Sequence, residues 1–417
     1  MTSRPRRLAH AAAPLALASL VLAGCAAEAA DAPTPDEAPT EEQQGDGHGH
    51  VEGAQELGEP QPRLVSVSSD GTVGVLDLLT EEAEEIGSVG APIRAASDGR
   101  FAFVETDEGV DVVDGGAWSW DHGDHFHYYA ADPALPGSIP GEGPVAVATP
   151  PLATAGGTGL FFSGSGDAVL VDMKALSEGE VSELFRLETD ASAGVVAPVG
   201  DAAVVALADG SDAGLARVVD AEGSPTGVEE ACEDPSGAIA TRVGTVVGCA
   251  DGALLAVAPG GDVTLERIPF PDDAAERPLA FDGRKNRPTV AGLSGSDGFW
   301  LLDTRAGEWT HAEVDATLVR VVAADDDDEN VVALDDEGRV RVFGRDGEER
   351  AATEPLVADA LAGTEASGVS LTVDTQRAYL GDPVAGVVHE IDYADGARIA
   401  RELTPATSPA VSAEVGR

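Results

Sequence analysis

The sequence predicts an all-β fold, a β-propeller, and three observations predict it. A turn that contains Gly, usually with Asp or Glu, precedes four to six residues of alternating apolar character, and this unit recurs from Arg63 onward. A second strand-like run precedes the turn, as in Arg100–Val104 and Asn330–Leu334. No stretch between these units has a helical pattern of note. Short strands repeated about every 45 residues without helices are typical of a propeller.

Eight such units predict eight blades. Their turn glycines lie 38 to 57 residues apart and supply the positive φ of a tight hairpin. They are Gly71, Gly109, Gly166, Gly214, Gly252, Gly298, Gly338 and Gly386. The first unit lacks an innermost strand, which Ser408–Val415 is expected to supply, closing the ring. If that unit instead pairs with the last one, the ring has seven blades. We assign residues 63–417 to the propeller.

Residues 1–24 have the pattern of a lipoprotein signal peptide. Three basic residues (Arg4, Arg6 and Arg7) precede the apolar run Leu8–Leu22, which is too short to span a bilayer. The run closes with Leu22–Cys25, a bacterial lipobox in which Cys25 is acylated and becomes the first residue. The alternative is an ordinary signal peptide with a coincidental Cys. We expect a protein on the extracytoplasmic face of the cell membrane, anchored by lipid on Cys25.

Residues 25–62 are predicted to be a disordered acidic tether. This stretch is rich in Ala, Pro, Glu, Asp and Gly and has no apolar periodicity, so it cannot bury enough surface to offset its ordering entropy. It contains His48 and His50, which form either a weak metal-capture arm or part of a plain spacer.

The composition limits the classes of binding partner and indicates the redox compartment of the protein. The chain has 417 residues and a formal net charge of −50, which repels nucleic acid and attracts cations. Of three cysteines, Cys25 belongs to the lipobox, which leaves Cys232 and Cys249. In an oxidising compartment this even pair is expected to form a disulfide. The alternative is a pair of zinc thiolates.

Potential metal ligands are concentrated in Trp118–Tyr129. Imidazole and carboxylate together suit zinc, which takes four N, O or S ligands in a tetrahedron. Residues two apart in a strand share a face, so His125 and His127 are placed to bind one ion, with His122 and Asp124 bending in from the preceding turn. The alternative is an exposed polar hairpin whose aromatic residues pack on a neighbouring sheet.

With the His-Gly-His tether, the His122–Tyr129 motif, the cysteine pair and the segment Gly386–Gly396, the chain resembles the AztD-type periplasmic zinc metallochaperones. The resemblance runs from about residue 45 to the end. It implies a β-propeller that binds zinc and delivers it to the solute-binding protein of a zinc ABC importer. It also implies histidines at the blade starts, near the central channel. The corresponding positions, Pro144–Thr149, Ser192–Val196 and Pro235–Gly237, hold none, so only the ligands of the Trp118–Tyr129 stretch carry over.

Two other functions compete with zinc handling. Propellers are rigid discs suited to docking partners, so an interaction scaffold without metal is the first alternative. The second is a propeller enzyme, which we do not expect, because the sequence shows no nucleophile–His–acid signature. We expect a monomer that is not an enzyme and does not bind nucleic acid.

Overall fold

Strands make up nearly all the regular structure of the computed structural model, as predicted. The structure describes residues 49–121, 123, 125–271 and 276–417, which all belong to one unit, Gly45–Arg417. The predicted signal peptide with Cys25, the tether as far as His48, and both His122 and Asp124 lie outside the described residues. The helical segments described are α1 (Met173–Ser177), α2 (Ala358–Ala362), η1 (Pro259–Gly261) and η2 (Ala366–Gly368). Within these limits, no helix has the length and apolar character needed to cross a bilayer.

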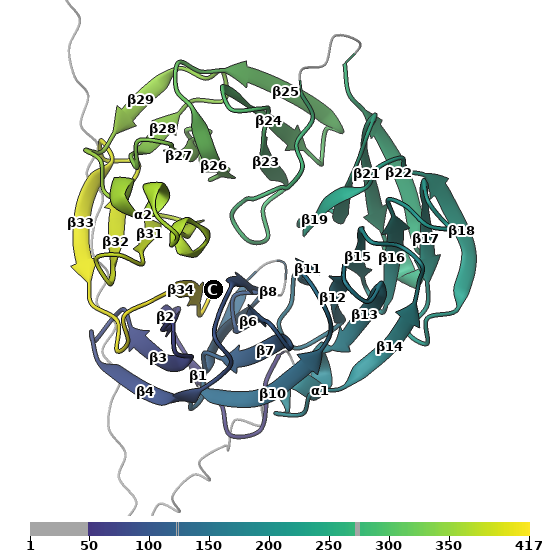
Figure 1. Ribbon diagram of the computed structural model, residues 1–417, viewed down its shortest axis with the longest axis horizontal. Coiled ribbons are helices and arrows are strands. Elements are labelled where there is room, and N and C mark those ends of the chain that lie inside the picture. The colour runs from purple at the N-terminus through teal and green to yellow at the C-terminus, as the bar shows by residue number, and fades with distance from the viewer. Residues whose placement is uncertain (1–48, 122, 124, 272–275) are drawn as a thin grey trace, which may run out of the picture. The chain divides into compact units, whose positions relative to one another are not determined.

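The described strands form nine antiparallel sheets, eight of which are arranged in a ring (Figure 1). The first ring sheet contains β34 (Val411–Val415), β2 (Arg63–Val67), β3 (Thr72–Asp77) and β4 (Ala83–Ser88). The second contains β5 (Arg94–Ser97), β6 (Phe101–Thr106), β7 (Gly109–Asp114) and β10 (Ala134–Pro140). The third contains β11 (Val145–Ala148), β12 (Gly157–Phe162), β13 (Asp167–Asp172) and β14 (Glu183–Glu188). The fourth contains β15 (Gly194–Val199), β16 (Ala202–Leu207), β17 (Leu215–Val219) and β18 (Pro225–Ala231).

The second half of the chain continues the series. The fifth sheet contains β19 (Ser236–Ala240), β20 (Thr245–Cys249), β21 (Gly252–Val257) and β22 (Thr264–Pro269). The sixth contains β23 (Thr289–Leu293), β24 (Gly298–Asp303) and β25 (Glu308–Glu313). The seventh contains β26 (Leu318–Ala323), β27 (Val331–Asp335), β28 (Val340–Phe343) and β29 (Glu349–Ala352). The eighth contains β30 (Leu371–Val373), β31 (Ala378–Asp382), β32 (Val387–Asp392) and β33 (Arg398–Leu403).

The two ends of the ring are joined within one sheet. Strand β34 pairs antiparallel with β2, from Arg63 opposite Val415 to Val67 opposite Val411. This confirms the expected closing strand. In the sixth sheet an isolated bridge between Asp282 and Ala291 pairs the preceding loop with β23. That loop thus occupies the place of a fourth, innermost strand.

Hydrophobic cores lie between neighbouring sheets of the ring. Strand β13 is typical: Val169 and Val171 pack against the second sheet, whereas Ala168 and Leu170 pack against the fourth, and all four are fully buried. Each ring sheet shares one such core with the sheet before it and another with the sheet after it. This two-sided burial explains why the middle strands are nearly continuous runs of Val, Leu, Phe and Ala.

Seven of the eight predicted turn glycines have a positive φ. The prediction is wrong for Gly298, because in that turn Gly295 takes the positive φ instead, at 60°. Gly109, at the turn from β6 to β7, has a φ of 135°, and a Cβ there would lie 2.2 Å from the carbonyl oxygen of Ile139. A side chain therefore clashes at this position, and only glycine adopts this φ readily.

The start of the described chain differs from the predicted tether. Residues Gln55–Leu57, assigned to the tether, form strand β1, which pairs antiparallel with β9 (Phe126–Ala130). With β8 (Ala117–Asp121) these strands make the ninth sheet. These three residues form a strand because their backbone pairs with a hairpin more than 70 residues later in the chain. Amino-acid composition cannot reveal such a long-range pairing.

The predicted disulfide is present. Cys232 and Cys249 are bonded, with Cα atoms 5.1 Å apart, and both are buried in the core between the fourth and fifth sheets. Closing this loop of 17 residues contributes roughly 3 kcal/mol on the loop-entropy model.

A buried histidine predicts acid sensitivity. His389 on β32 is 7% exposed, and burial lowers the pKa of its imidazole below the ordinary value of 6.5, against the opposing charges of Glu402 and Asp382. Below about pH 6.5 the unfolded chain takes up a proton that the folded chain resists, so the free energy of unfolding falls as the pH is lowered. Chemical denaturation at pH 7.5 and 5.5 should show a smaller acid loss for His389→Gln than for the parent. An equal loss in both proteins contradicts this account.

Candidate metal centre

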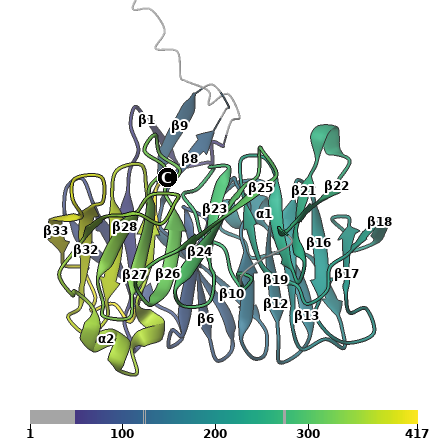
Figure 2. The same ribbon diagram turned by 90° about the horizontal axis from the view of Figure 1, so that it is seen from above.

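The β8–β9 hairpin stands above one face of the ring, whereas α2 lies at the opposite face (Figure 2). It is an insertion between β7 and β10 of the second sheet. In its register Trp118 faces Tyr129 and Trp120 faces His127, so these four side chains share one face. Strand β1 extends that face, since Glu56 pairs with Tyr129. Insertions of this kind on a rigid scaffold often carry function.

Aromatic packing holds the base of the hairpin. Trp118 and Tyr129 are buried, and their rings stack with centroids 5.4 Å apart. The indole Nε1 of Trp118 donates a hydrogen bond of 2.9 Å to the carbonyl oxygen of Gly49. Gly49 lies against Trp120, and a Cβ there would be 2.5 Å from the Trp120 ring. The beginning of the described chain is therefore fastened to the hairpin.

A buried ion pair lies beneath this base. The guanidinium of Arg100 is 3.8 Å from the centroid of the Trp118 ring and 2.7 Å from the carboxylate of Asp114. Both side chains are almost fully buried. Asp114 also accepts a hydrogen bond of 2.8 Å from the backbone N–H of Gly116, directly before β8. This pair fixes where the hairpin leaves the second sheet.

Two histidines meet at the free end of the hairpin. The Nε2 atoms of His125 and His127 are 3.0 Å apart, and their ring centroids are 4.8 Å apart. Two nitrogen ligands on a tetrahedral zinc ion, each at 2.0–2.1 Å, lie about 3.3 Å apart. The expected spacing of two along the chain therefore brings both imidazoles to a separation close to that of ligands on one ion.

A carboxylate orients one of these rings. Oε1 of Glu56 on β1 lies 2.7 Å from Nδ1 of His127. A carboxylate only accepts, so His127 donates Nδ1–H to Glu56, and the neutral ring carries its lone pair on Nε2. That lone pair faces Nε2 of His125 at 3.0 Å, which is a hydrogen-bond distance. Histidine ligands of metals typically donate their second N–H to a carboxylate in this way, which fixes the ring and raises its basicity.

The turn of the hairpin also contacts the fifth sheet. Arg242, between β19 and β20, donates a hydrogen bond of 3.0 Å to the carbonyl oxygen of Gly123 and lies 4.0 Å from the carboxylate of Asp121. Asp121 in turn accepts the backbone N–H of Gly123 at 2.7 Å. Gly123 is thus held both by its own strand and by a distant sheet.

The predicted ligands have different outcomes. His125 and His127 are brought together, whereas His122 and Asp124 lie outside the described residues. Among the residues that are described, no group of three or more His, Cys, Asp or Glu side chains is arranged to hold a metal ion. The structure therefore brings together two imidazoles of the predicted set, and Glu56 contacts the opposite side of one ring.

The predicted capture arm is described only at His50. Its ring meets Tyr129 edge-on at a centroid distance of 6.0 Å, and Tyr129 stacks on His127 at 6.3 Å. His50 therefore lies beside the hairpin, with Tyr129 between it and His127. His48 lies outside the described residues.

Sequence reasoning missed Glu56 and Arg242. Glu56 belongs to an acidic stretch whose composition resembles a tether, and a three-residue strand leaves no periodic signal. Arg242 is one arginine in a short turn and acts on a segment about 120 residues earlier in the chain. Only the tertiary pairing reveals either residue.

Other candidate ligands have structural partners. His311 bonds Ser294 at 3.0 Å. In the acidic run 325–329, Asp325 accepts from Arg287, and Asp326 accepts from Asn330.

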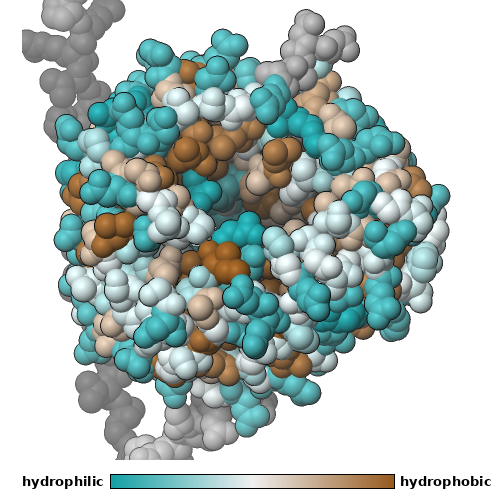
Figure 3. Space-filling model, viewed as in Figure 1, coloured by the Kyte–Doolittle hydropathy of each residue, from teal (hydrophilic) through white to brown (hydrophobic). Residues whose placement is uncertain are grey.

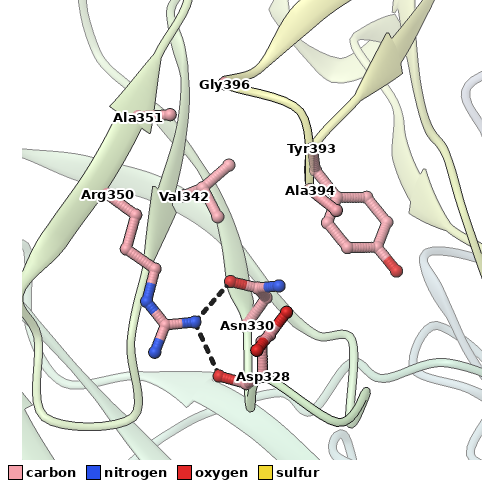
Figure 4. A pocket seen from close by; sticks show the side chains of 8 residues that line it. All are labelled: Asp328, Asn330, Val342, Arg350, Ala351, Tyr393, Ala394 and Gly396. Carbon is pink, nitrogen blue, oxygen red and sulfur yellow. Dashed lines mark hydrogen bonds between the residues drawn. The ribbon is translucent and has the colours of Figure 1, made fainter.

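A polar cavity of about 240 Å³ adjoins this run, and Figure 4 shows Arg350 reaching toward Asp328 and Asn330 there. Its Nη1 donates to the Asp328 carbonyl and to Asn330 Oδ1, both at 2.6 Å. Hydrogen bonds within the protein therefore explain the position of the Arg350 guanidinium.

The segments expected at the blade starts do line the centre of the ring. A cavity of about 510 Å³ is bordered by Pro144–Ala148, Ser192–Val196 and Gly237, together with residues of β5, β6 and β12. No histidine is among its described lining residues.

The fold is similar to that of AztD from Citrobacter koseri. A crystal structure of that protein superposes with a TM-score of 0.70 at 20% identity, over 86% of this chain and 99% of the other. Its apo structure gives 0.71 at 18% identity over the same shares. Dihydro-heme d1 dehydrogenase NirN, in complex with DHE, gives 0.52 at 16% identity over 85% of this chain and 75% of the other. At these identities the likeness to AztD establishes the propeller-like fold.

Comparison of the sequence alone finds no match. No family model matches the chain. No curated protein matches it either.

The Glu56 contact can be tested by Glu56→Gln. The amide keeps the shape but replaces the charged acceptor of His127 Nδ1–H with a neutral one. We expect zinc affinity to fall about 10–100-fold, the usual effect of removing such a partner. Competition with a chromophoric chelator measures it. The control is Glu52→Gln, an exposed carboxylate that precedes β1, which should leave affinity unchanged. Equal affinities for Glu56→Gln and the parent would show that the contact only positions β1.

Proposed function

We propose that this protein binds zinc at the turn of the β8–β9 hairpin. The observation that carries the proposal is the pair of Nε2 atoms of His125 and His127, 3.0 Å apart, with Glu56 on the far nitrogen of His127. His122 and Asp124 supply the third and fourth ligands. An N₃O set suits zinc because a d¹⁰ ion has no ligand-field preference for another geometry.

We further propose that the protein is a zinc metallochaperone. It delivers the ion to the solute-binding protein of a zinc ABC importer and has no enzymatic activity of its own. The family resemblance of the motifs and the AztD-like fold support this role. The eight ring sheets are taken as eight blades. The lipobox supports an extracytoplasmic protein held at the membrane by lipid on Cys25, and the proposal takes this protein to be a monomer.

The capture arm belongs to the same proposal. His48 and His50 bind zinc weakly and pass it to the hairpin. The position of His50 beside Tyr129 and His127 supports such a hand-over, since the donor and acceptor sites are then neighbours.

Zinc titration of the purified mature protein, with elemental analysis, tests the binding step. One tightly bound zinc per chain is expected, with an affinity that falls as the pH is lowered, because protons compete for the imidazole nitrogens. A protein that takes up no zinc at pH 7.5 is instead an interaction scaffold. Mixing the zinc-loaded protein with the solute-binding protein, then separating and assaying both, tests delivery. Cys25→Ser tests the anchor, since the variant should leave the membrane fraction.

A further inference from the structure

The central cavity has the build of a second binding site, independent of the proposed zinc function. It lies at the start of the innermost strands β11, β15 and β19. In the eighth sheet α2 precedes the innermost strand, so these strand starts share the face of α2, opposite the hairpin. Figure 3 views this face and shows a hollow at the centre of the ring with apolar residues beside it. At about 510 Å³ the cavity falls within the range of small-molecule sites, about 300–1,000 Å³.

The walls are mostly apolar. Alanine, valine and phenylalanine side chains of the second to fifth sheets line the cavity, together with Leu279 and Phe281 from the loop before β23. Leu279 is 66% exposed, although it lies inside the ring. An apolar wall in contact with water binds apolar molecules, because their contact removes hydrocarbon surface from water.

The polar side chains that line the cavity differ in whether they keep a hydrogen-bond donor for a ligand. Ser163 donates to the carbonyl of Pro144 at 2.9 Å, and Ser192 bonds the carboxylate of Asp209. Arg94 donates through Nε and Nη2 to Oε2 of Glu105, at 3.0 and 2.7 Å. These bonds leave Nη1 for a further acceptor, and the Arg94 side chain is 53% exposed, whereas that of Glu105 is 7% exposed. Among the lining residues that the structure describes, Arg94 is therefore the one cationic donor, and it lies at an apolar wall.

We propose that the central cavity binds an organic acid with an unbranched apolar chain. Its carboxylate accepts from Nη1 of Arg94, and its chain lies along Leu279, Phe281 and Val147. One guanidinium with a spare edge suits a single carboxylate, whereas a phosphate or a nucleotide requires more donors.

The overall negative charge of the protein works against the binding of an anion, so a preference for an anion is a stringent test. A chain of net charge −50 attracts cations and repels anions without any site. If the protein binds an anionic amphiphile more tightly than a cationic one of equal length, it does so against the electrostatic field of its net charge. Such a preference would have to come from local contacts with Arg94.

Calorimetric titration of the mature protein with decanoate, and separately with decyltrimethylammonium, tests the proposal. Decanoate should bind at one site and more tightly than the cation. Ala146→Phe places a ring in the cavity at an exposed alanine of β11 and should abolish decanoate binding. Unchanged decanoate binding in this variant, or tighter binding of the cation than of decanoate, overturns the proposal.

Two further variants test the carboxylate contact, and they should change the affinity for decanoate in opposite directions. Arg94→Gln should weaken decanoate binding about tenfold, the loss of one charge-assisted hydrogen bond. Glu105→Gln leaves Arg94 without its carboxylate partner and should tighten decanoate binding, an effect that partial unfolding cannot produce. Weaker binding in Glu105→Gln contradicts the assignment of Arg94. Replacement of His125 and His127 by alanine should leave decanoate binding unchanged, which separates this site from the hairpin.

Discussion

Replacing His125 and His127 together by alanine is expected to abolish tight zinc binding. The two imidazoles converge at 3.0 Å and supply two of the four proposed ligands, so the double variant leaves only His122 and Asp124. The loss should exceed the 10–100-fold expected for Glu56→Gln, because ligands themselves are removed. Equilibrium competition with a chelator, with elemental analysis of the isolated protein, measures the effect.

The matched control is His311→Ala. This residue bonds Ser294 in the sixth sheet, outside the hairpin, and its loss should leave zinc affinity unchanged. If the double variant binds zinc as tightly as the parent, the hairpin has only a structural role and the protein is better described as a scaffold.

Asp114→Asn is expected to cause the largest loss of stability. The substitution removes the negative charge beside Arg100, whose side chain is 3% exposed, and leaves a buried guanidinium without its counter-charge. Breaking a buried pair by removing one partner costs about 3–5 kcal/mol. Denaturant titration should show this decrease in the free energy of unfolding. Because Arg100 packs on Trp118, the near-ultraviolet circular dichroism of the tryptophans should change as well.

Asp107→Asn is the control for this prediction. Asp107 lies in the exposed turn that joins β6 to β7, and its substitution should change stability by no more than about 0.5 kcal/mol. Equal, small effects of both substitutions would show that water, rather than Asp114, stabilises the Arg100 charge.

The ring could be predicted from the sequence because its signals are local and repeated. A glycine with positive φ, such as Gly109, marks seven of the eight predicted hairpins at the predicted residue, and the alternating runs mark the strands. The closing strand β34 was predictable because the first unit lacks a partner that the last residues can supply. The sixth sheet shows the limit of this reasoning, since its innermost position is filled by a loop through one bridge at Asp282. A single bridge imposes no pattern on the sequence.

The candidate site was predictable only along one segment. A spacing of two along a strand is enough to bring His125 and His127 together, because it depends on backbone geometry alone. The contributions of Glu56 and Arg242 depend on where β1 and the fifth sheet come to lie. Their residue types are common on an acidic surface, and their sequence neighbours carry no information about the hairpin. Tertiary placement, rather than local propensity, decides those contacts.

The pairing of β34 with β2 also has a consequence for how the protein is made. The partners are separated by more than 340 residues, so the first sheet has an open inner edge until Val411–Val415 has been synthesised. The core that this sheet shares with the second sheet stays incomplete for the same reason, since Val411, Ala413 and Val415 belong to it. Contacts of such long sequence separation form slowly, and an unpaired strand edge invites association with other chains. Until β34 pairs with it, the inner edge of β2 therefore stays open to association with other chains.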